Sequence, residues 1–494
     1  MLKTLEEYIK SLEKMRDNIY MGGELVKRTD PRIMPGIRVI STTYELAQKP
    51  EYEELLTAKS HLTGEKVNRF THVPQSPEDL IKKQRMIRTL AQRVGGCIQR
   101  CMGLDTITAL SVATKEIDEK YGTEYYQRFI NWLKYFQEND LCAAAAQTDV
   151  KGDRSRRPHE QEDPDLYVRI VEKRDDGIIV RGAKCCITMA AYAHEIVVLP
   201  TRAMTDKDKD YAVAFAIPAD HERVHIINRA VWVRQRKKYK APLAETGISD
   251  AFIVFDDAFI PKERVFMCGE WEFARRLALL FANSHRHSYT GCKPAVSDII
   301  AGATALVAEY NGIERAPHVR EKISEIIGSA ELAYAAGIAS AVLGHKTSSG
   351  TFFPNPIYAN VGRRLMGETI YHEYNILVEI AGGLVVTLPY EDDFINEKTK
   401  PFLDKYMKRN PKISSEDQHR CFRFLENLAA SDLAAWYQIA GVHGGGSPIM
   451  ETITLMAEYD LESKKEIARY LAGIKEKLDQ EKLLKEKTIL EEKQ

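Results

Sequence analysis

DLYVRIVEKRDDGIIVRGAKCCIT, residues 165–188, alternates polar and apolar side chains on both sides of the tripeptide Asp175-Asp176-Gly177. This alternation around a turn-forming sequence is typical of a β-hairpin. Four more short runs rich in β-branched or aromatic residues lie nearby, each ended by turn formers, at 194–200, 211–218, 223–228 and 251–261. We therefore expect residues 141–270 to form an antiparallel β domain.

Helical periodicity flanks this section on both sides. Residues 76–122 begin with Ser76 as an expected N-cap and an acidic first turn, and apolar residues then recur three and four apart. The same spacing returns after residue 270, and the highly charged tail 461–494 is expected to form a solvated helix or to pack on a partner subunit. The predicted fold class is α+β, with a helical N-terminal domain (1–140), the β domain (141–270) and a C-terminal helix bundle (271–494).

Composition narrows the class of protein. The 494 residues are 44% hydrophobic and 29% charged, which describes an ordinary globular chain. A formal net charge of −1 argues against a general nucleic-acid binder. The sequence contains no run of 18 or more apolar residues, so no membrane span is predicted. The N-terminus lacks the apolar core of a signal peptide. We expect a cytoplasmic protein whose eight cysteines are thiols and not a disulfide scaffold.

Two of these cysteines form a spaced pair. Cys97 and Cys101 lie four apart in GGCIQRCMG (95–103), so on a helix they would project from one face. A competing interpretation is that both are buried small hydrophobes, as free cysteines usually are. A metal site here would need further ligands from elsewhere in the chain.

The stretch SHRHSYTGCK (284–293) can supply those ligands. His285 and Cys292 lie seven apart, two helical turns, and Tyr289 falls between them on the same face, where it could donate a proton. Three thiolates and one imidazole suit zinc or an iron–sulfur cluster. The alternative is a polar helix face with an incidental cysteine.

Several loops have ligand-binding composition. QTDVKGDRSRRP (147–158) offers backbone N–H groups and cations to a phosphate or a flavin edge, although a solvated loop has the same composition. EIAGGLVVTLP (379–389) and VHGGGSP (442–448) contain glycine turns that a ligand could approach closely, but neither is a dinucleotide-binding G-x-G-x-x-G fingerprint. RQRKKYK (234–240) is expected to be a solvent-facing cationic loop.

The chain resembles the 4-hydroxybutyryl-CoA dehydratase family over nearly its whole length. Seven motifs occur in the expected order: GGCIQRCMG, QTDVKGDR, RIVEKRDDGIIVRGAK, FDDAFIPKERVF, HRHSYTGCK, IAGGLVVTLP and HGGGSP. The resemblance implies the fold of the acyl-CoA dehydrogenases and of the flavin-dependent 4-hydroxyphenylacetate 3-monooxygenases. It also implies a homotetramer and an acyl-CoA substrate, with dehydration of a 4-hydroxybutyryl-CoA-like thioester and isomerisation of vinylacetyl-CoA as activities.

The resemblance further implies two cofactors. A [4Fe–4S] cluster would be held by Cys97, Cys101, His285 and Cys292, ligands that the monooxygenase relatives lack. FAD would bind beside it, at positions matching Gln147, Thr148, Asp149, Lys151, Gly152, Asp153, Arg154, Lys184, Thr188, Gly382 and Gly383.

By the same resemblance, His285 would also act as a base, Tyr289 would donate a proton to the departing oxygen, and Lys293 would tune the local charge. Two catalytic glutamates of the family pattern are replaced, by Asp250 and by Ile449. Glu451 could stand in for the second only if the backbone shifts. These departures leave open a family member that acts on a different substrate. Two other hypotheses are a flavin-dependent phenol monooxygenase and a non-enzymatic protein with a structural zinc.

Three cysteines remain outside this scheme. We expect Cys185, Cys186 and Cys421 to serve only in packing.

Overall fold

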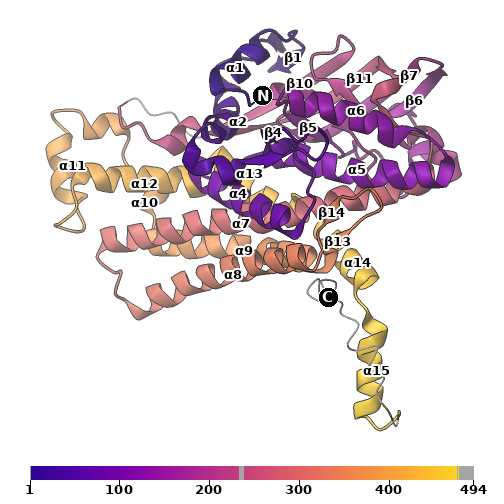
Figure 1. The fold of residues 1–494 in the computed structure, drawn as a ribbon. Coiled ribbons are helices and arrows are strands. Elements are labelled where there is room, and N and C mark those ends of the chain that lie inside the picture. Colours follow the sequence, from indigo (N-terminus) through magenta and orange to yellow (C-terminus); the bar gives the residue numbers. More distant parts are fainter. Residues whose placement is uncertain (1, 233–237, 476, 478–494) are drawn as a thin grey trace.

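Two β-sheets form the middle of the computed structural model, which describes residues 2–232, 238–475 and 477 (Figure 1). The predicted hairpin is confirmed, since β6 and β7 pair antiparallel with Arg174 opposite Gly177. The larger sheet has the order β2-β1-β10-β11-β7-β6 and the smaller β12-β9-β8-β5. Their strands from this section are β5 (Ala143–Ala146), β6 (Arg169–Arg174), β7 (Gly177–Thr188), β8 (Glu195–Val198), β9 (Val213–Pro218), β10 (Val224–Trp232), β11 (Gly247–Pro261) and β12 (Val265–Cys268).

We expected antiparallel sheets, but both sheets also contain a parallel pair of strands. β1 (Ile19–Met21) pairs parallel with β10, and β5 pairs parallel with β8. The first 140 residues are also not wholly helical, because they contain β1, β2 (Glu24–Val26), β3 (Thr57–Lys59) and β4 (Lys66–Asn68). Strands of three residues are too short to show a period of two, so the sequence pattern did not reveal them.

Helices make up most of the remainder of the first 140 residues. They are α1 (Leu5–Glu13), α2 (Met34–Ala47), α3 (Glu53–Leu56), α4 (Pro77–Val94), α5 (Cys101–Tyr121) and α6 (Tyr125–Glu138). α4 begins as predicted, because the Ser76 hydroxyl accepts a hydrogen bond from the Asp79 amide at 3.2 Å. It ends at Gly95, whose φ of 80° stops the helix before α5 begins.

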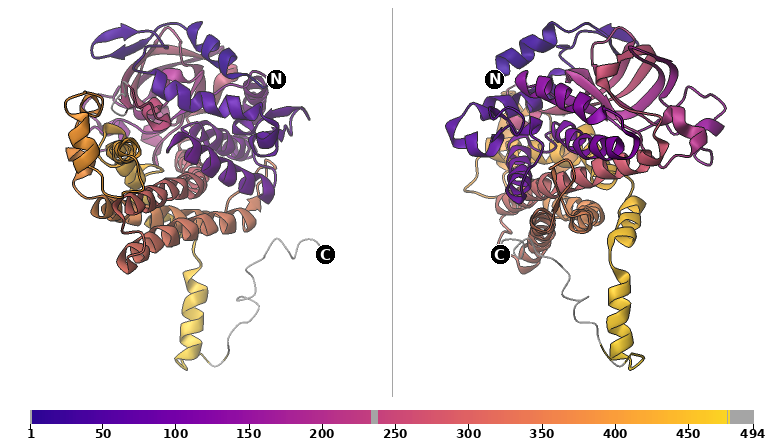
Figure 2. Two further views of the ribbon diagram at one scale, coloured as in Figure 1. Left: turned by 90° about the vertical axis from the view of Figure 1, so that its left-hand side faces the viewer. Right: turned by 45° about the vertical axis from the view of Figure 1, so that its right-hand side comes forward.

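The C-terminal section is mainly helical, as predicted from residue 271 onward, but two strands of two residues each interrupt it. α7 (Ala274–Asn311), α8 (Pro317–Val342) and α9 (Pro356–Ala381) lie side by side, and α15 (Leu461–Leu471) projects away from the body (Figures 1 and 2). The other elements are β13 (His345–Lys346), β14 (Phe352–Phe353), α10 (Leu384–Thr387), α11 (Lys400–Tyr406), α12 (Ser415–Ala429), α13 (Asp432–His443) and α14 (Pro448–Glu458). The first part of the charged tail is therefore helical, and most of 476–494 falls outside the described residues.

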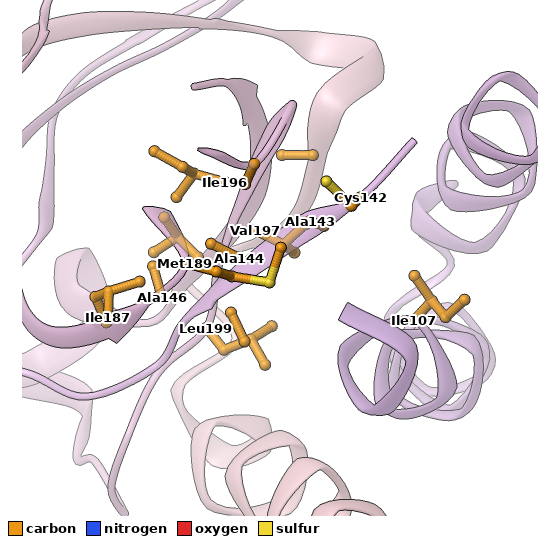
Figure 3. Packing of buried hydrophobic residues seen from close by; sticks show 14 of the residues in the cluster. Ile107, Cys142, Ala143, Ala144, Ala146, Ile187, Met189, Ile196, Val197 and Leu199 are labelled. Carbon is orange, nitrogen blue, oxygen red and sulfur yellow. The ribbon is translucent and has the colours of Figure 1, made fainter. Parts of the chain in front are cut away.

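Small residues bring α5 close to the smaller sheet. Figure 3 shows Ile107 of α5 across from the alanines of β5, with β8 behind them. A side chain on Gly103 would meet the Ala143 carbonyl oxygen at 2.8 Å, so glycine is needed for this approach. Close packing here fixes the N-terminal end of α5, where Cys101 lies.

The long helix α7 continues through a proline. Pro294 has no N–H, so the Thr290 carbonyl loses its helical donor four residues later. The Gln84 side-chain amide of α4 donates to that carbonyl at 3.0 Å instead. This hydrogen bond links α4 to α7 next to Cys292 and Lys293.

Among the described helices, α8 alone has the length and mean hydropathy of a membrane span, and one third of its apolar window is buried. It packs against α7 and α9 as a helix of the bundle.

Candidate metal and cofactor site

Four predicted metal ligands come together from three segments of the chain. His285 and Cys292 lie on α7, and Cys101 is the first residue of α5. The prediction that Cys97 shares a helix with Cys101 is wrong, because Cys97 lies in the connection between α4 and α5. Gly95 and Gly96, with φ of 80° and 154°, break the helix just before it.

Cys101 and His285 are close neighbours, and Cys97 and Cys292 lie near enough to Cys101 to affect its pKa. Ligand atoms of Cys101, Asp105 and His285 all lie within 4.8 Å of one another. Burial, then the charges of Cys97, Asp105 and Cys292, raise the pKa of the Cys101 thiol well above its usual value. Burial likewise raises the pKa of Cys97, and that of Cys292 to about 12. Thiols in such a site are protonated until a metal displaces the protons, and the donor set fits a Cys₃His centre.

Asp105 anchors the imidazole, and the sequence analysis missed it. His285 Nδ1 lies 2.8 Å from one Asp105 oxygen, and the Lys83 ammonium lies 2.6 Å from the other. Burial alone would raise the pKa of Asp105, but Lys83 and His285 lower it to about 2. A signal was available in the sequence, because Asp105 is the single charged residue between positions 101 and 114.

Tyr289 lies beside His285, as predicted. Its ring meets the imidazole edge-on at a centroid distance of 5.2 Å, and its hydroxyl donates to the Ala440 carbonyl at 2.7 Å. The Arg363 guanidinium lies 4.8 Å and the Lys293 ammonium 5.2 Å from the ring centroid. Burial raises the pKa of Tyr289 well above its usual value, while Arg363 opposes this rise. The phenol is therefore protonated and flanked by two cations.

The glycine turn after α13 packs directly on Tyr289. A side chain on Gly444 would overlap the Tyr289 hydroxyl, so this position has room only for glycine. Two buried arginines that the sequence analysis did not single out hold the turn in place. Arg363 donates to the Gly444 carbonyl at 2.9 Å, and Arg286 donates to the Gly445 carbonyl at 3.1 Å.

Glu451 points inward at the start of α14. Its side chain is 2% exposed and lies 3.5 Å from the Arg363 guanidinium, whereas Ile449 is 60% exposed. Burial raises the pKa of Glu451, and Arg363 and Arg286 oppose the rise. Of the two positions, 451 is therefore the one that places a buried side chain next to Arg363.

Asp250 and Thr188 meet across the larger sheet. They are register partners in β11 and β7, and the Thr188 hydroxyl donates to Asp250 at 2.7 Å. The Trp436 indole N–H of α13 donates to the other Asp250 oxygen. The charge of Asp250 also contributes to the raised pKa of Cys97. A predicted catalytic residue and a predicted flavin residue thus lie together near the thiols.

The loop Gln147–Arg154 is held by Lys184, another predicted flavin residue. The Lys184 ammonium donates to the Gln147 carbonyl at 2.9 Å, to Asp149 at 2.5 Å and to the Leu199 carbonyl at 2.8 Å. Lys184 of β7 therefore holds the loop next to β7 and to the residue that follows β8. The predicted residues at the tip of the loop are exposed, namely Lys151, Gly152, Asp153 and Arg154, and Gln147 and Thr148 are half-buried.

The second predicted flavin turn lies elsewhere in the chain. Gly382 and Gly383 are exposed at the C-terminal end of α9. At 1.5 Å per residue they lie about 28 Å along the helix axis from Arg363. One chain therefore does not bring this turn to the thiols.

The remaining predicted features have simpler surroundings. Cys421 is buried in the helical core, and Cys185 donates to the Asp149 carbonyl at 3.0 Å. Cys186 is exposed at a φ of 54°, so it is not a packing residue as expected. Most of RQRKKYK falls in 233–237, outside the described residues, while the Lys238 amide donates to Glu391 at 2.9 Å.

Comparison with known proteins gives a family. The models for the N-terminal and C-terminal parts of 4-hydroxyphenylacetate 3-hydroxylase match residues 4–267 and 274–473. The chain is 42% identical, over 96% of its length and 100% of the relative, to 4-hydroxybutyryl-CoA dehydratase/vinylacetyl-CoA-Δ-isomerase of Clostridium aminobutyricum. The chain belongs to the 4-hydroxybutyryl-CoA dehydratase family.

Solved structures agree with this membership. An archaeal 4-hydroxybutyryl-CoA dehydratase from N. maritimus, described as oxygen tolerant, is 39% identical with a TM-score of 0.91, covering 97% of this chain and 96% of that one. The oxygenase component of 4-hydroxyphenylacetate 3-monooxygenase, in complex with FAD and 4-hydroxyphenylacetate, has a TM-score of 0.87 at 27% identity, covering 95% and 98%. The dehydratase family and the hydroxylases therefore share this mixed α/β fold.

Proposed function

We propose that this protein is a [4Fe–4S]- and FAD-dependent dehydratase that converts a 4-hydroxybutyryl-CoA-like thioester to crotonyl-CoA and water, with vinylacetyl-CoA isomerisation as a second activity. The observation that carries the proposal is the convergence of Cys97, Cys101, Cys292 and His285 beside Tyr289. The 42% identity to a dehydratase of that name supports the substrate class.

The proposed reaction explains why such a site needs more than a base. Dehydration removes an unactivated β hydrogen and a γ hydroxyl, whereas an enolate mechanism acidifies only the α position. When bound, the cluster would supply a Lewis-acidic iron and the flavin one-electron chemistry. Cys97, Cys101, His285 and Cys292 would hold the cluster.

The chain's own residues would move the protons. Because Nδ1 of His285 is committed to Asp105, Nε2 carries the lone pair that would bind iron or accept a substrate proton. The Tyr289 hydroxyl would leave the Ala440 carbonyl and protonate the departing oxygen. Lys293 and Arg363 would stabilise the phenolate left behind, since both lie over the ring.

Two carboxylates, Asp250 and Glu451, complete the residues that we propose for catalysis. Asp250 would act where it meets Thr188 and Trp436, at the edge of the proposed flavin site. Glu451 would act from the α14 side of the site, next to Arg363. An aspartate in place of a glutamate shortens the reach of the carboxylate by about 1.5 Å on standard bond geometry. A hydroxyacyl group of a different length is therefore the alternative substrate.

FAD would bind along the loop Gln147–Arg154 and the strand end Lys184–Thr188. We place Gly382 and Gly383 at the flavin of a neighbouring subunit, because α9 holds them far from the thiols of their own chain. A homotetramer would provide that neighbour, and the apolar side chains that α8 and α9 expose offer a surface for it: Ile327, Leu332, Val361, Tyr371 and Val378.

The proposal includes the three-domain, acyl-CoA dehydrogenase-like organisation (1–140, 141–270, 271–494) and a cytoplasmic location. Strands that cross the first boundary, such as β1 beside β10, join the N-terminal segment to the β domain.

A flavin-dependent phenol hydroxylase is the second candidate. It is favoured by the hydroxylase family models and by the fold shared with the FAD-bound oxygenase component. A hydroxylase of this kind has no use for three thiols and an imidazole in one place, so we rank it below the dehydratase.

The proposal is tested by purifying the protein without oxygen and measuring iron, acid-labile sulfide, zinc and FAD per chain. About four irons, four sulfides and one FAD, with turnover of 4-hydroxybutyryl-CoA or vinylacetyl-CoA, would support the dehydratase. FAD without iron would favour the hydroxylase, and zinc alone would point to a structural metal site. Absorption spectra before and after exposure to air would determine whether the protein is sensitive to oxygen. The relative from N. maritimus is described as oxygen tolerant, so this property has to be measured.

A further inference from the structure

A buried hydrogen-bond network around Asp105 connects α4, α5 and α7 and includes His285 of α7. Lys83 of α4 and two serines of α7, Ser284 and Ser288, all donate to the same oxygen of this α5 carboxylate, at 2.6, 2.9 and 3.0 Å. The other oxygen lies 2.8 Å from Nδ1 of His285. One oxygen is thus saturated by three donors, and the other faces the imidazole.

This arrangement selects one form of the imidazole. Because Lys83 neutralises Asp105 within a fully buried pair, the carboxylate is an acceptor only, and Nδ1 must carry the hydrogen. The lone pair is then on Nε2. The ring is also held by Phe281, stacked at 5.7 Å, and by Tyr289, edge-on at 5.2 Å. Hydrogen bonding and packing therefore both oppose rotation of the ring.

We propose that Asp105 is a positioning residue for His285, fixing the tautomer and ring orientation that present Nε2, and that Lys83 holds the carboxylate group in place. This inference rests on the proposed function, because a free Nε2 matters only if His285 binds the cluster or takes a substrate proton. Carboxylates that accept from the far nitrogen of a metal-bound histidine orient the ring and raise its basicity, and their loss typically costs 10- to 100-fold in affinity or activity.

The test is Asp105→Asn in the full-length protein, purified without oxygen and compared with wild type. We measure iron per chain, the nitrogen hyperfine coupling of the reduced cluster by electron paramagnetic resonance methods, and dehydration of 4-hydroxybutyryl-CoA. The three thiols are unchanged, so most of the iron should remain. The nitrogen coupling should shrink or vanish, and activity should fall by about 10- to 100-fold.

A matched control separates positioning from general stability. Glu195→Gln removes a buried carboxylate that pairs with Arg264 at 2.7 Å in the smaller sheet. It should lower the melting temperature and leave the nitrogen coupling as in wild type. If Asp105→Asn does not fold, Lys83→Gln serves instead, since it removes the ammonium that donates at 2.6 Å to the far oxygen of Asp105 and holds that side chain in place.

The outcomes distinguish the two proposals. A cluster-loaded Asp105→Asn protein with wild-type coupling and activity would overturn the positioning role and leave the dehydratase proposal standing. Wild-type protein without iron would overturn both. Loss of coupling in Asp105→Asn together with normal coupling in Glu195→Gln is the expected result.

Discussion

Gly444 allows the placement of the Tyr289 hydroxyl to be tested by adding one methyl group. The backbone at Gly444 has a φ of −65°, which alanine adopts without strain. A Cβ at this position would nevertheless lie 1.5 Å from the Tyr289 hydroxyl oxygen and 2.7 Å from Cζ. The effect of Gly444→Ala is therefore steric, and it acts on the proposed proton donor.

The size of the effect follows from the overlap. Ordinary contact between heavy atoms begins near 3.5 Å, so the hydroxyl or the turn must move by about 2 Å. Such a shift breaks the hydrogen bond to the Ala440 carbonyl, now 2.7 Å long. Overpacking of this kind costs about 1–3 kcal/mol of folding free energy. A catalytic group displaced by about 1 Å can lose a factor of 10² in rate, so we expect kcat to fall by at least about 100-fold.

The assay measures kcat for 4-hydroxybutyryl-CoA together with the melting temperature. Gly302→Ala is the control, because a Cβ there meets nothing within 4 Å and should change neither quantity much. Adding Tyr289→Phe to Gly444→Ala removes the atom in closest overlap, so the double variant should regain part of the lost stability but no activity. Wild-type kcat and melting temperature in Gly444→Ala would refute the inferred position of Tyr289.

Three further outcomes are expected. Cys101→Ala should lose most of the bound iron while keeping its fold by circular dichroism, and wild-type iron content would exclude Cys101 as a ligand. Glu451→Gln should lower kcat by at least about tenfold, whereas Ile449→Gln should stay near wild type because that side chain is 60% exposed; equal effects would contradict the role of Glu451. Burial raises the pKa of Glu373, so the folded protein binds its proton more tightly than the unfolded chain, and stability should fall as the pH rises from about 4.5 through the folded pKa. Glu373→Gln should flatten that part of the melting-temperature profile, and an unchanged slope would assign it to other groups.

Local patterns in the sequence predicted the elements whose signals are local. The hairpin at 165–188 is present because alternation reports a half-buried strand and Asp-Asp-Gly reports the turn. The N-cap at Ser76 and the placement of His285 and Cys292 on one helix were predicted from residues within a few turns of each other. Resemblance to a family then supplied the link between the two ligand motifs.

The pairing of distant residues needed the tertiary structure. Cys97 meets the α7 ligands from a non-helical connection, since two glycines with positive φ override the spacing that suggested a shared helix. Arg363 and Glu451 come together only because the turn after α13 folds back onto α9. Periodicity predicts which side of a helix or strand is buried, but it does not predict which other segment of the chain packs against that side. The inward position of Glu451, the anchor Asp105 and the remote turn at Gly382 are consequences of packing between segments far apart in the chain, and only the folded structure reveals them.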